Sequence, residues 1–277
     1  MNFKILSLAL VVITISGVAI ADTVTTPAPS STTASKSTFD WTGVYLGGFV
    51  GGATGANVTS STNGKFNYSE YGAGSSNYST SSSFMGGGTV GYNWQIPKTP
   101  YLIGLEGEYG YLGQSGSSQT TTPPSAGNGM QYNTQNKTTI GSNFGYGLVG
   151  GRLGYALDRS LFYVKSGAVF TQVTSTNSST PSCPSCFPIS SNSNNAGGTT
   201  TGFALGGGIE YAPSWYSNKN LTLKVEYLYF GIPTSSNSTG LGRDSRPGGS
   251  PSFTYQENYH NSTGGISTAK IGVNYKF

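Results

Sequence analysis

Hydrophobic side chains alternate with small, polar or charged ones over residues 267–277, at the end of the chain. Because successive side chains of a β-strand point to opposite faces, this segment predicts a strand with two unlike faces. One face holds Ala269, Ile271, Val273, Tyr275 and Phe277, and the other holds Lys270, Gly272, Asn274 and Lys276. A final strand that is apolar outside, cationic inside and aromatic at its end is typical of a barrel that faces lipid.

Similar strand-like segments recur along the chain, separated alternately by short and long connections. We place eight strands at about 41–51, 84–95, 101–113, 143–157, 161–173, 202–212, 220–230 and 264–277. Three connections are short (96–100, 158–160 and 213–219), and four are long and polar (around 52–83, 114–142, 174–201 and 231–263). This plan predicts an all-β fold, an eight-stranded antiparallel up-and-down transmembrane β-barrel with three periplasmic turns and four extracellular loops.

A water-soluble β-sandwich is the alternative that has the same alternation of faces. Its apolar face, however, would need a second sheet to cover it, and a strict alternation of long and short connections is unusual in sandwiches. Aromatic residues such as Tyr101, Tyr111 and Trp94 lie mostly near predicted strand ends, as the interfacial girdles of a membrane barrel require. The pattern therefore favours the membrane barrel.

The start of the chain predicts export from the cytoplasm. Residues 1–21 combine a short positive start, an apolar run and a small-x-small cleavage signal, which predicts a signal peptide removed before Asp22. A retained membrane helix is the alternative, but the apolar run is short for a span. Residues 22–38 predict a flexible Ser/Thr/Pro-rich periplasmic leader, and residues 39–277 the barrel domain.

The amino-acid composition indicates the fold class and argues against nucleic acid as a partner. Charged residues make up 9 % of the chain, while 42 residues are glycine and 19 are tyrosine. This composition suits strands better than a helical domain. The net charge of +4 is too small and too dispersed to indicate binding to nucleic acid.

The scarce charges recur at positions in phase with the inward faces of their strands. We expect an interior charge network of Glu106, Glu108, Arg152, Lys165, Glu210, Lys224, Glu226, Lys270 and Lys276. Two interpretations are open: a charged path for solutes, or a plug of ion pairs that locks the barrel. We favour the plug, because the interior of an eight-stranded barrel is just wide enough for side chains and unpaired charges there would be costly.

The two ends of the barrel domain carry a family resemblance. Residues 39–47, Phe-Asp-Trp-Thr-Gly-Val-Tyr-Leu-Gly, and residues 271–277, Ile-Gly-Val-Asn-Tyr-Lys-Phe, resemble the alphaproteobacterial outer-membrane immunogenic and hemin-binding surface proteins, which are opacity/porin-like small barrels. The resemblance implies a surface antigen with exposed loops, and in some members hemin acquisition or weak porin-like permeability.

The single histidine is the candidate ligand if hemin binds. His260 lies at the end of the fourth long loop, and Tyr255 and Tyr259 precede it. An imidazole or phenolate can coordinate haem iron, and a tyrosine ring could stack on the porphyrin. The alternative, which we favour, is an exposed loop histidine without such a role.

Two cysteines, Cys183 and Cys186, lie three residues apart in the third long loop. Their Ser/Thr/Asn/Pro-rich surroundings have no helical pattern, so a thioredoxin-type centre is disfavoured, and two cysteines without nearby histidines do not make a structural zinc site. In an oxidising compartment we expect a small disulfide loop. With one histidine, no nucleophile–base–acid set is evident, and we predict neither an enzyme nor a metal site.

These observations predict a multi-pass outer-membrane protein with surface-exposed loops and a structural or interaction role. Its expected partners are outer-membrane lipid, the barrel-assembly machinery, and host or environmental ligands that contact the loops. The alternative function is uptake, either as a hemin-binding protein or as a small-solute pore; hemin is then a ligand, and no cofactor is expected.

Overall fold

The computed structural model describes residues 39–66, 69–121, 131–141, 145–182, 192–215, 220–232, 234–243 and 254–277. The predicted signal peptide, the predicted leader up to residue 38, and both cysteines lie outside the described residues. All described residues belong to the second of the two compact units into which the chain divides, Ala34–Phe277. The part of the chain that the structure describes contains no helix with the length and hydrophobicity of a membrane span.

Eight antiparallel strands form a closed barrel. They are β1 (Gly43–Ala53), β4 (Ser83–Gln95), β5 (Tyr101–Leu112), β8 (Tyr146–Leu157), β9 (Ser160–Ser182), β10 (Asn192–Tyr211), β11 (Leu221–Gly231) and β14 (Ile266–Lys276). Neighbours in the barrel follow this order, β9 pairs with β10, and β14 pairs with β1 to close the ring. The predicted eight-stranded barrel is confirmed.

Four regions that the sequence predicted as long loops contain paired strands. They hold β2 (Asn57–Phe66), β3 (Ser69–Ser79), β6 (Gln114–Thr121), β7 (Gln131–Ile140), β12 (Thr234–Arg243), β13 (Thr254–Thr263) and the first half of β10 with the second half of β9. The long connections are therefore β-hairpins, a conformation that the sequence did not predict. These segments are rich in Ser, Thr and Asn, so they show no hydrophobic period, and their strands are held by backbone ladders that hydropathy cannot reveal.

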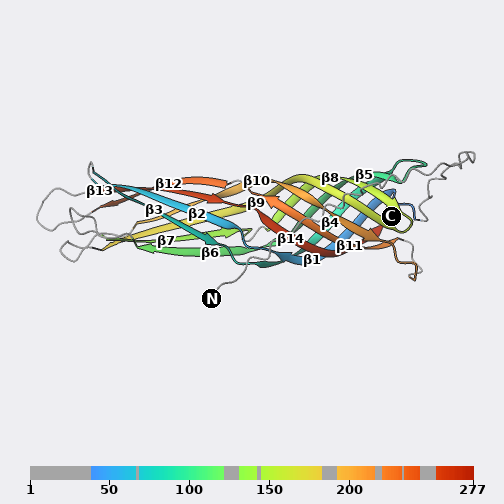
Figure 1. The fold of residues 1–277 in the computed structure, drawn as a ribbon, viewed down its shortest axis with the longest axis horizontal. Helices are drawn as coiled ribbons and strands as arrows, with labels where there is room; N and C mark the ends of the chain where they lie inside the picture. Colours follow the sequence, from blue (N-terminus) through green and yellow to red (C-terminus); the bar gives the residue numbers. More distant parts are fainter. Residues whose placement is uncertain are drawn as a thin grey trace, which may run out of the picture. The chain divides into compact units, whose positions relative to one another are not determined.

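The four hairpins continue the barrel strands into an extension (Figure 1). β12, β13, β2 and β3 form one four-stranded sheet, and β6 and β7 join the long strands β9 and β10. β3 lies beside β6, where the Ser81 amide donates to the Ser115 carbonyl at 2.9 Å. Within the described ranges no ladder joins β3 to β6 or β10 to β12, so these are two seams in the wall of the extension.

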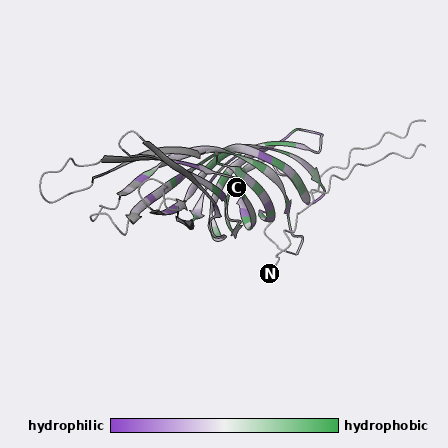
Figure 2. Ribbon diagram, turned by 60° about the vertical axis from the view of Figure 1, so that its left-hand side comes forward, coloured by the Kyte–Doolittle hydropathy of each residue, from purple (hydrophilic) through white to green (hydrophobic). Residues whose placement is uncertain are grey.

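The barrel carries its hydrophobic side chains on the outside. Leu105, Tyr109 and Val225 are each more than 60 % exposed, and they alternate with buried residues along β5 and β11. Figure 2 shows green hydrophobic bands on the barrel strands. An apolar exterior is stable only in contact with lipid, so the barrel is the membrane-spanning part.

The barrel interior is layered. Apolar side chains fill the end at which the chain enters β1: Phe39, Trp41, Leu102, Ala156, Leu161, Tyr163 and Ala212. A larger apolar cluster fills the interior towards the extension and includes Phe49, Met85, Leu112, Leu148, Leu228 and Phe230. Since Glu106 and Glu108 follow Leu102 and precede Leu112 on the inner face of β5, charged side chains lie between the two apolar layers.

Candidate functional site

Eight of the nine charged residues predicted to face inward lie together inside the barrel. We call them the charge belt: Glu106, Glu108, Arg152, Lys165, Glu210, Lys224, Glu226 and Lys270, each at most 5 % exposed. Four carboxylates face four cations, so the belt has no net formal charge. Because an unpaired buried charge is costly, this balance is what a dry interior requires.

Lys165 and Lys270 join three of the carboxylates. Lys165 Nζ contacts Glu106 Oε1, Glu108 Oε2 at 2.9 Å and Glu226 Oε1 at 3.5 Å. Lys270 Nζ lies 2.6 Å from Glu108 Oε1 and 2.7 Å from Glu226 Oε1. Lys165 on β9 thus connects β5 with β11, strands on different sides of the barrel, so the ion pairs cross the lumen.

Arg152 connects Glu210 with Glu106, and Lys224 Nζ lies 3.7 Å from Glu106 Oε1. Arg152 Nη1 lies 3.2 Å from Glu210 Oε2 and 3.6 Å from Glu106 Oε2, and its Nε donates to Asn93 Oδ1 at 2.7 Å. Its guanidinium also lies over the rings of Tyr45 and Tyr163, 4.6 Å and 5.1 Å from their centroids. Such charge–ring contacts are strongest where water is excluded.

Each glutamate also accepts a hydrogen bond from a neutral side chain. Tyr45 donates to Glu106 at 2.6 Å, Tyr163 donates to Glu226 at 2.9 Å, and Tyr146 donates to Glu108. Glu210 accepts from Asn274 Nδ2 at 2.8 Å and from Thr222. The sequence prediction did not include these partners, although the three tyrosines lie in inward phase on their strands.

Lys276 shares the inward phase but lies apart from the belt. Its Nζ donates to the Asp40 carbonyl oxygen and lies 4.9 Å from the centre of the Phe39 ring, at the end of the barrel where the chain enters β1. Strand phase gives the face of a side chain but not its height in the barrel. The structure therefore does not bring Lys276 into contact with the four glutamates.

The belt contains a cluster that resembles a metal site in composition only. One carboxylate oxygen from each of Glu106, Glu108 and Glu226 lies within 4.8 Å of the others. The ammonium of Lys165 contacts all three carboxylates and so occupies the place that a cation would need. The arrangement is that of an ion-pair network.

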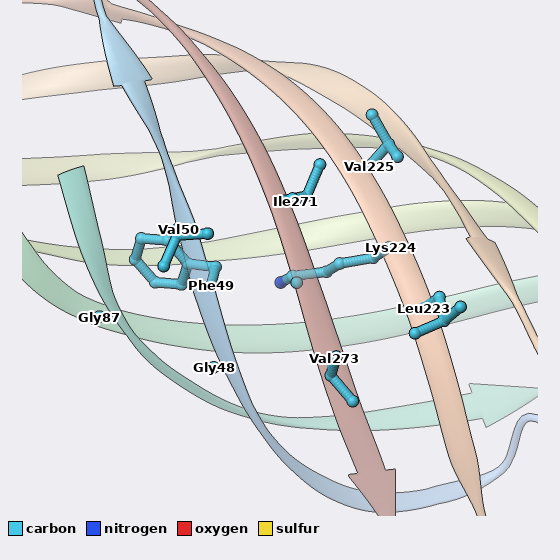
Figure 3. Close-up of a pocket in the computed structure, with 10 residues that line it drawn as sticks. Gly48, Phe49, Val50, Gly87, Leu223, Lys224, Val225, Ile271 and Val273 are labelled. Atoms are coloured by element: carbon cyan, nitrogen blue, oxygen red, sulfur yellow. The ribbon is translucent and has the colours of Figure 1, made fainter. Parts of the chain in front are cut away.

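One hollow of about 630 Å³ lies along β1, β11 and β14. Figure 3 shows Lys224 extending across β14 towards Phe49, while its neighbours Leu223 and Val225 point elsewhere. The side chains that line the outer part are apolar, and Lys224 is buried inside the barrel. The hollow therefore offers an apolar surface to lipid chains and has no converging polar groups that could orient a polar ligand.

His260 and Tyr259, two of the residues considered for hemin, lie on opposite faces of β13. His260 is exposed, whereas Tyr259 is 1 % exposed. His260 pairs with Asn237 and Ser61 in the sheet. Tyr255 lies in β13 as well, but its side chain is outside the described residues. A strand cannot direct two consecutive side chains to one porphyrin.

We expect His260→Ala to leave a hemin titration unchanged, since His260 lies on the exposed face of β13 and Tyr259 on its buried face. The measurement is the Soret absorbance of the purified protein on addition of hemin. Ser262→Ala, on the same exposed face of β13, is the matched control. A weaker or shifted Soret band in His260→Ala alone would make His260 a ligand.

Comparison with known proteins places this barrel in a family. The family model for the outer membrane protein beta-barrel domain matches residues 23–277. The chain is also similar to the 31 kDa outer-membrane immunogenic protein of Brucella melitensis and that of Brucella suis, with 31 % identity over 262 residues, 93 % of this chain and 92 % of each relative. The chain belongs to this family of outer-membrane β-barrels.

As a member of this outer-membrane barrel family, the protein resides in the outer membrane, and its apolar exterior is the lipid-facing surface. Among solved structures it is similar to OprG of Pseudomonas aeruginosa, with 13 % identity, a TM-score of 0.38, and coverage of 87 % of this chain and 99 % of that one. It is also similar to Ail of Yersinia pestis, with 11 % identity, a TM-score of 0.30, and coverage of 82 % and 99 %.

Proposed function

We propose that this protein is a surface contact protein, in which the barrel is the anchor and the extension presents a polar surface to the environment or host. One observation carries the proposal: the barrel interior is filled by the charge belt between two apolar layers, whereas the strands continue beyond it into hairpins. The relatives from Brucella are named as immunogenic proteins, which agrees with exposure at the cell surface.

The outer faces of the hairpins suit such a role. Their exposed side chains are short, polar and mostly uncharged, as at Asn77, Ser117, Gln119 and Thr199. A surface of this kind resists aggregation although it consists of strands, and it tolerates substitution. The function is therefore assigned to contact by the hairpins and not to passage through the barrel.

The proposed role is non-catalytic. Glu106 and Glu108 are the paired carboxylates that could suggest acid–base chemistry, but each is held by lysine and tyrosine. His260, the single histidine, lies on the exposed face of β13. An acid–base mechanism needs these groups to converge on one substrate, and they are on different parts of the molecule.

Cysteine labelling in intact cells tests which side the hairpins face. In a chain with Cys183 and Cys186 replaced by serine, we expect Asn77→Cys and Gln119→Cys to react with a membrane-impermeant maleimide. Lys98→Cys, in the short turn between β4 and β5, should react only after the outer membrane is permeabilised. Labelling of Lys98→Cys but not of the hairpin variants in intact cells would overturn the proposal.

A further inference from the structure

A ring of short amide and hydroxyl side chains lines the inside of the extension. We call it the amide rung, and it consists of Ser60, Ser76, Ser118, Asn136, Asn177 and Asn261. Ser60 pairs with Asn261 on one side and with Ser76 on the other. Ser118 pairs with Asn136, which pairs with Asn177. Six strands thus contribute one inward residue each at a single level.

The two halves of the rung meet across the seam between β3 and β6. The hydroxyls of Ser76 and Ser118 lie 2.9 Å apart, and Asn136 Nδ2 donates to Ser76 Oγ at 3.3 Å. These two serines are partly exposed, whereas the other four members are at most 2 % exposed. The seam has no ladder, so it is the part of the wall at which the rung is closest to solvent.

Most polar atoms of the rung lack a hydrogen-bond partner. Both amide atoms of Asn177 and of Asn261, Oδ1 of Asn136 and the hydroxyl of Ser60 are buried and unpaired. Buried amides are nearly always hydrogen-bonded in proteins, because leaving one unpaired loses the hydration it had in the unfolded chain. The rung therefore requires a partner that the described side chains do not supply.

At the next level towards the membrane, inward side chains do form hydrogen bonds with one another. There the Tyr78 hydroxyl reaches Thr138 Oγ1 at 2.8 Å, and Thr138 lies 3.3 Å from Ser175 Oγ. Burial raises the pKa of the Tyr78 hydroxyl, so it stays protonated and can donate. The long Tyr78 side chain thus spans the seam from β3 past β6 to β7 at this level. At the amide rung all six members are Ser or Asn, and none is as long.

We propose that the amide rung is a binding site for a neutral saccharide. A carboxamide offers a donor and an acceptor side by side, and a sugar hydroxyl both donates and accepts, so vicinal hydroxyls match an asparagine. A saccharide has hydroxyls around its ring, which fits groups that converge from six strands, whereas a peptide has donors and acceptors along two edges only. No member of the rung is charged, which excludes an anionic or cationic ligand that would be buried without a counter-charge.

Four members of the rung are at most 2 % exposed, so a ligand could enter only if the wall of the extension opened. An eight-stranded barrel can enclose one small ligand where the inward side chains are short. Binding would widen the β3–β6 seam, where, in the part of the chain that the structure describes, the Ser76–Ser118 hydrogen bond and the single backbone bond from Ser81 to Ser115 take the place of a ladder. This inference does not rest on the contact function of the outer surface: its failure would leave the labelling pattern of Asn77→Cys and Gln119→Cys unchanged.

Saturation-transfer NMR with two neutral probes, maltotriose and cellotriose, tests the site. The full-length protein is studied in lipid nanodiscs, because glucoside and maltoside detergents would compete. We expect saturation transfer to at least one probe, and a binding constant about tenfold weaker for each amide removed in Asn177→Leu and Asn261→Leu. Asn77→Leu, on the outer face beside Ser76, is the matched control and should bind like the wild type.

Folding of each variant is followed by heat-modifiable gel mobility. Replacing an unpaired buried amide by an apolar group of similar size should leave this mobility unchanged, since no hydrogen bond is lost. Asn177→Ala replaces Asn177→Leu if leucine prevents folding. The absence of saturation transfer from the wild type to both probes would overturn the proposal, and so would equal transfer in the wild type and the folded Asn177 variant.

Discussion

Replacing Lys165 with methionine is expected to destabilise the barrel by about 3–5 kcal/mol. Lys165 contacts Glu106, Glu108 and Glu226, and all four side chains are fully buried. Methionine has a similar length but no charge, so three carboxylates would share the remaining cations inside the barrel. The free energy of unfolding, measured in phospholipid vesicles by urea titration and tryptophan fluorescence, reports the loss.

Lys276→Met is the matched control, because Lys276 lies at the barrel end and has no contact with the belt glutamates. We expect a change below about 1 kcal/mol there. The double variant Lys165→Met with Glu106→Gln should recover part of the loss, since it removes a carboxylate together with its cation. Equal effects of Lys165→Met and Lys276→Met would contradict the ion-paired belt.

Gly167→Ala is expected to lower the free energy of unfolding by about 2–3 kcal/mol. A methyl group at this inward position of β9 would lie 2.3 Å from the Val149 carbonyl oxygen and 2.5 Å from Gly150 Cα. Both are backbone atoms of β8, which cannot rotate away, so the two strands would have to separate. The same urea titration measures the effect.

Gly147→Ala in β8 is the opposite case. This glycine lies on the outward face, and a methyl group there would meet nothing within 4 Å. Because glycine in a strand carries an entropic cost, we expect alanine to stabilise the barrel by about 0.5–1 kcal/mol. If both alanine variants changed stability in the same direction and by the same amount, the close approach of β8 and β9 would not be the cause.

Strand phase was sufficient to predict much of the barrel interior. Glu106, Glu108 and Lys165 stood out because charged residues are rare in this chain and these fall in inward phase. Tyr45, Tyr146 and Tyr163 were missed, since most tyrosines of the barrel strands are exposed and the residue type alone does not mark the inward ones. Only the register of the ladders brings each of them to its glutamate.

Other features depend on information that no single strand contains. The misplacement of Lys276 followed from height along the barrel, which the stagger between strands determines. The hairpins were not predicted because their segments are rich in Ser, Thr and Asn and show no alternation of hydrophobic and polar residues. Tyr259 and His260 were predicted to act together because their segment was taken to be a loop. In a strand, two consecutive side chains point to opposite faces.

We propose that the barrel is a sealed anchor and that the hairpins carry the function. Single-channel recording of the purified protein in planar lipid bilayers shows whether the lumen is closed. We predict no conductance steps from the wild type, because ion pairs and two apolar layers fill the lumen. Stable, reproducible steps from the folded wild-type protein would show an open lumen and overturn the assignment of function to the hairpins alone.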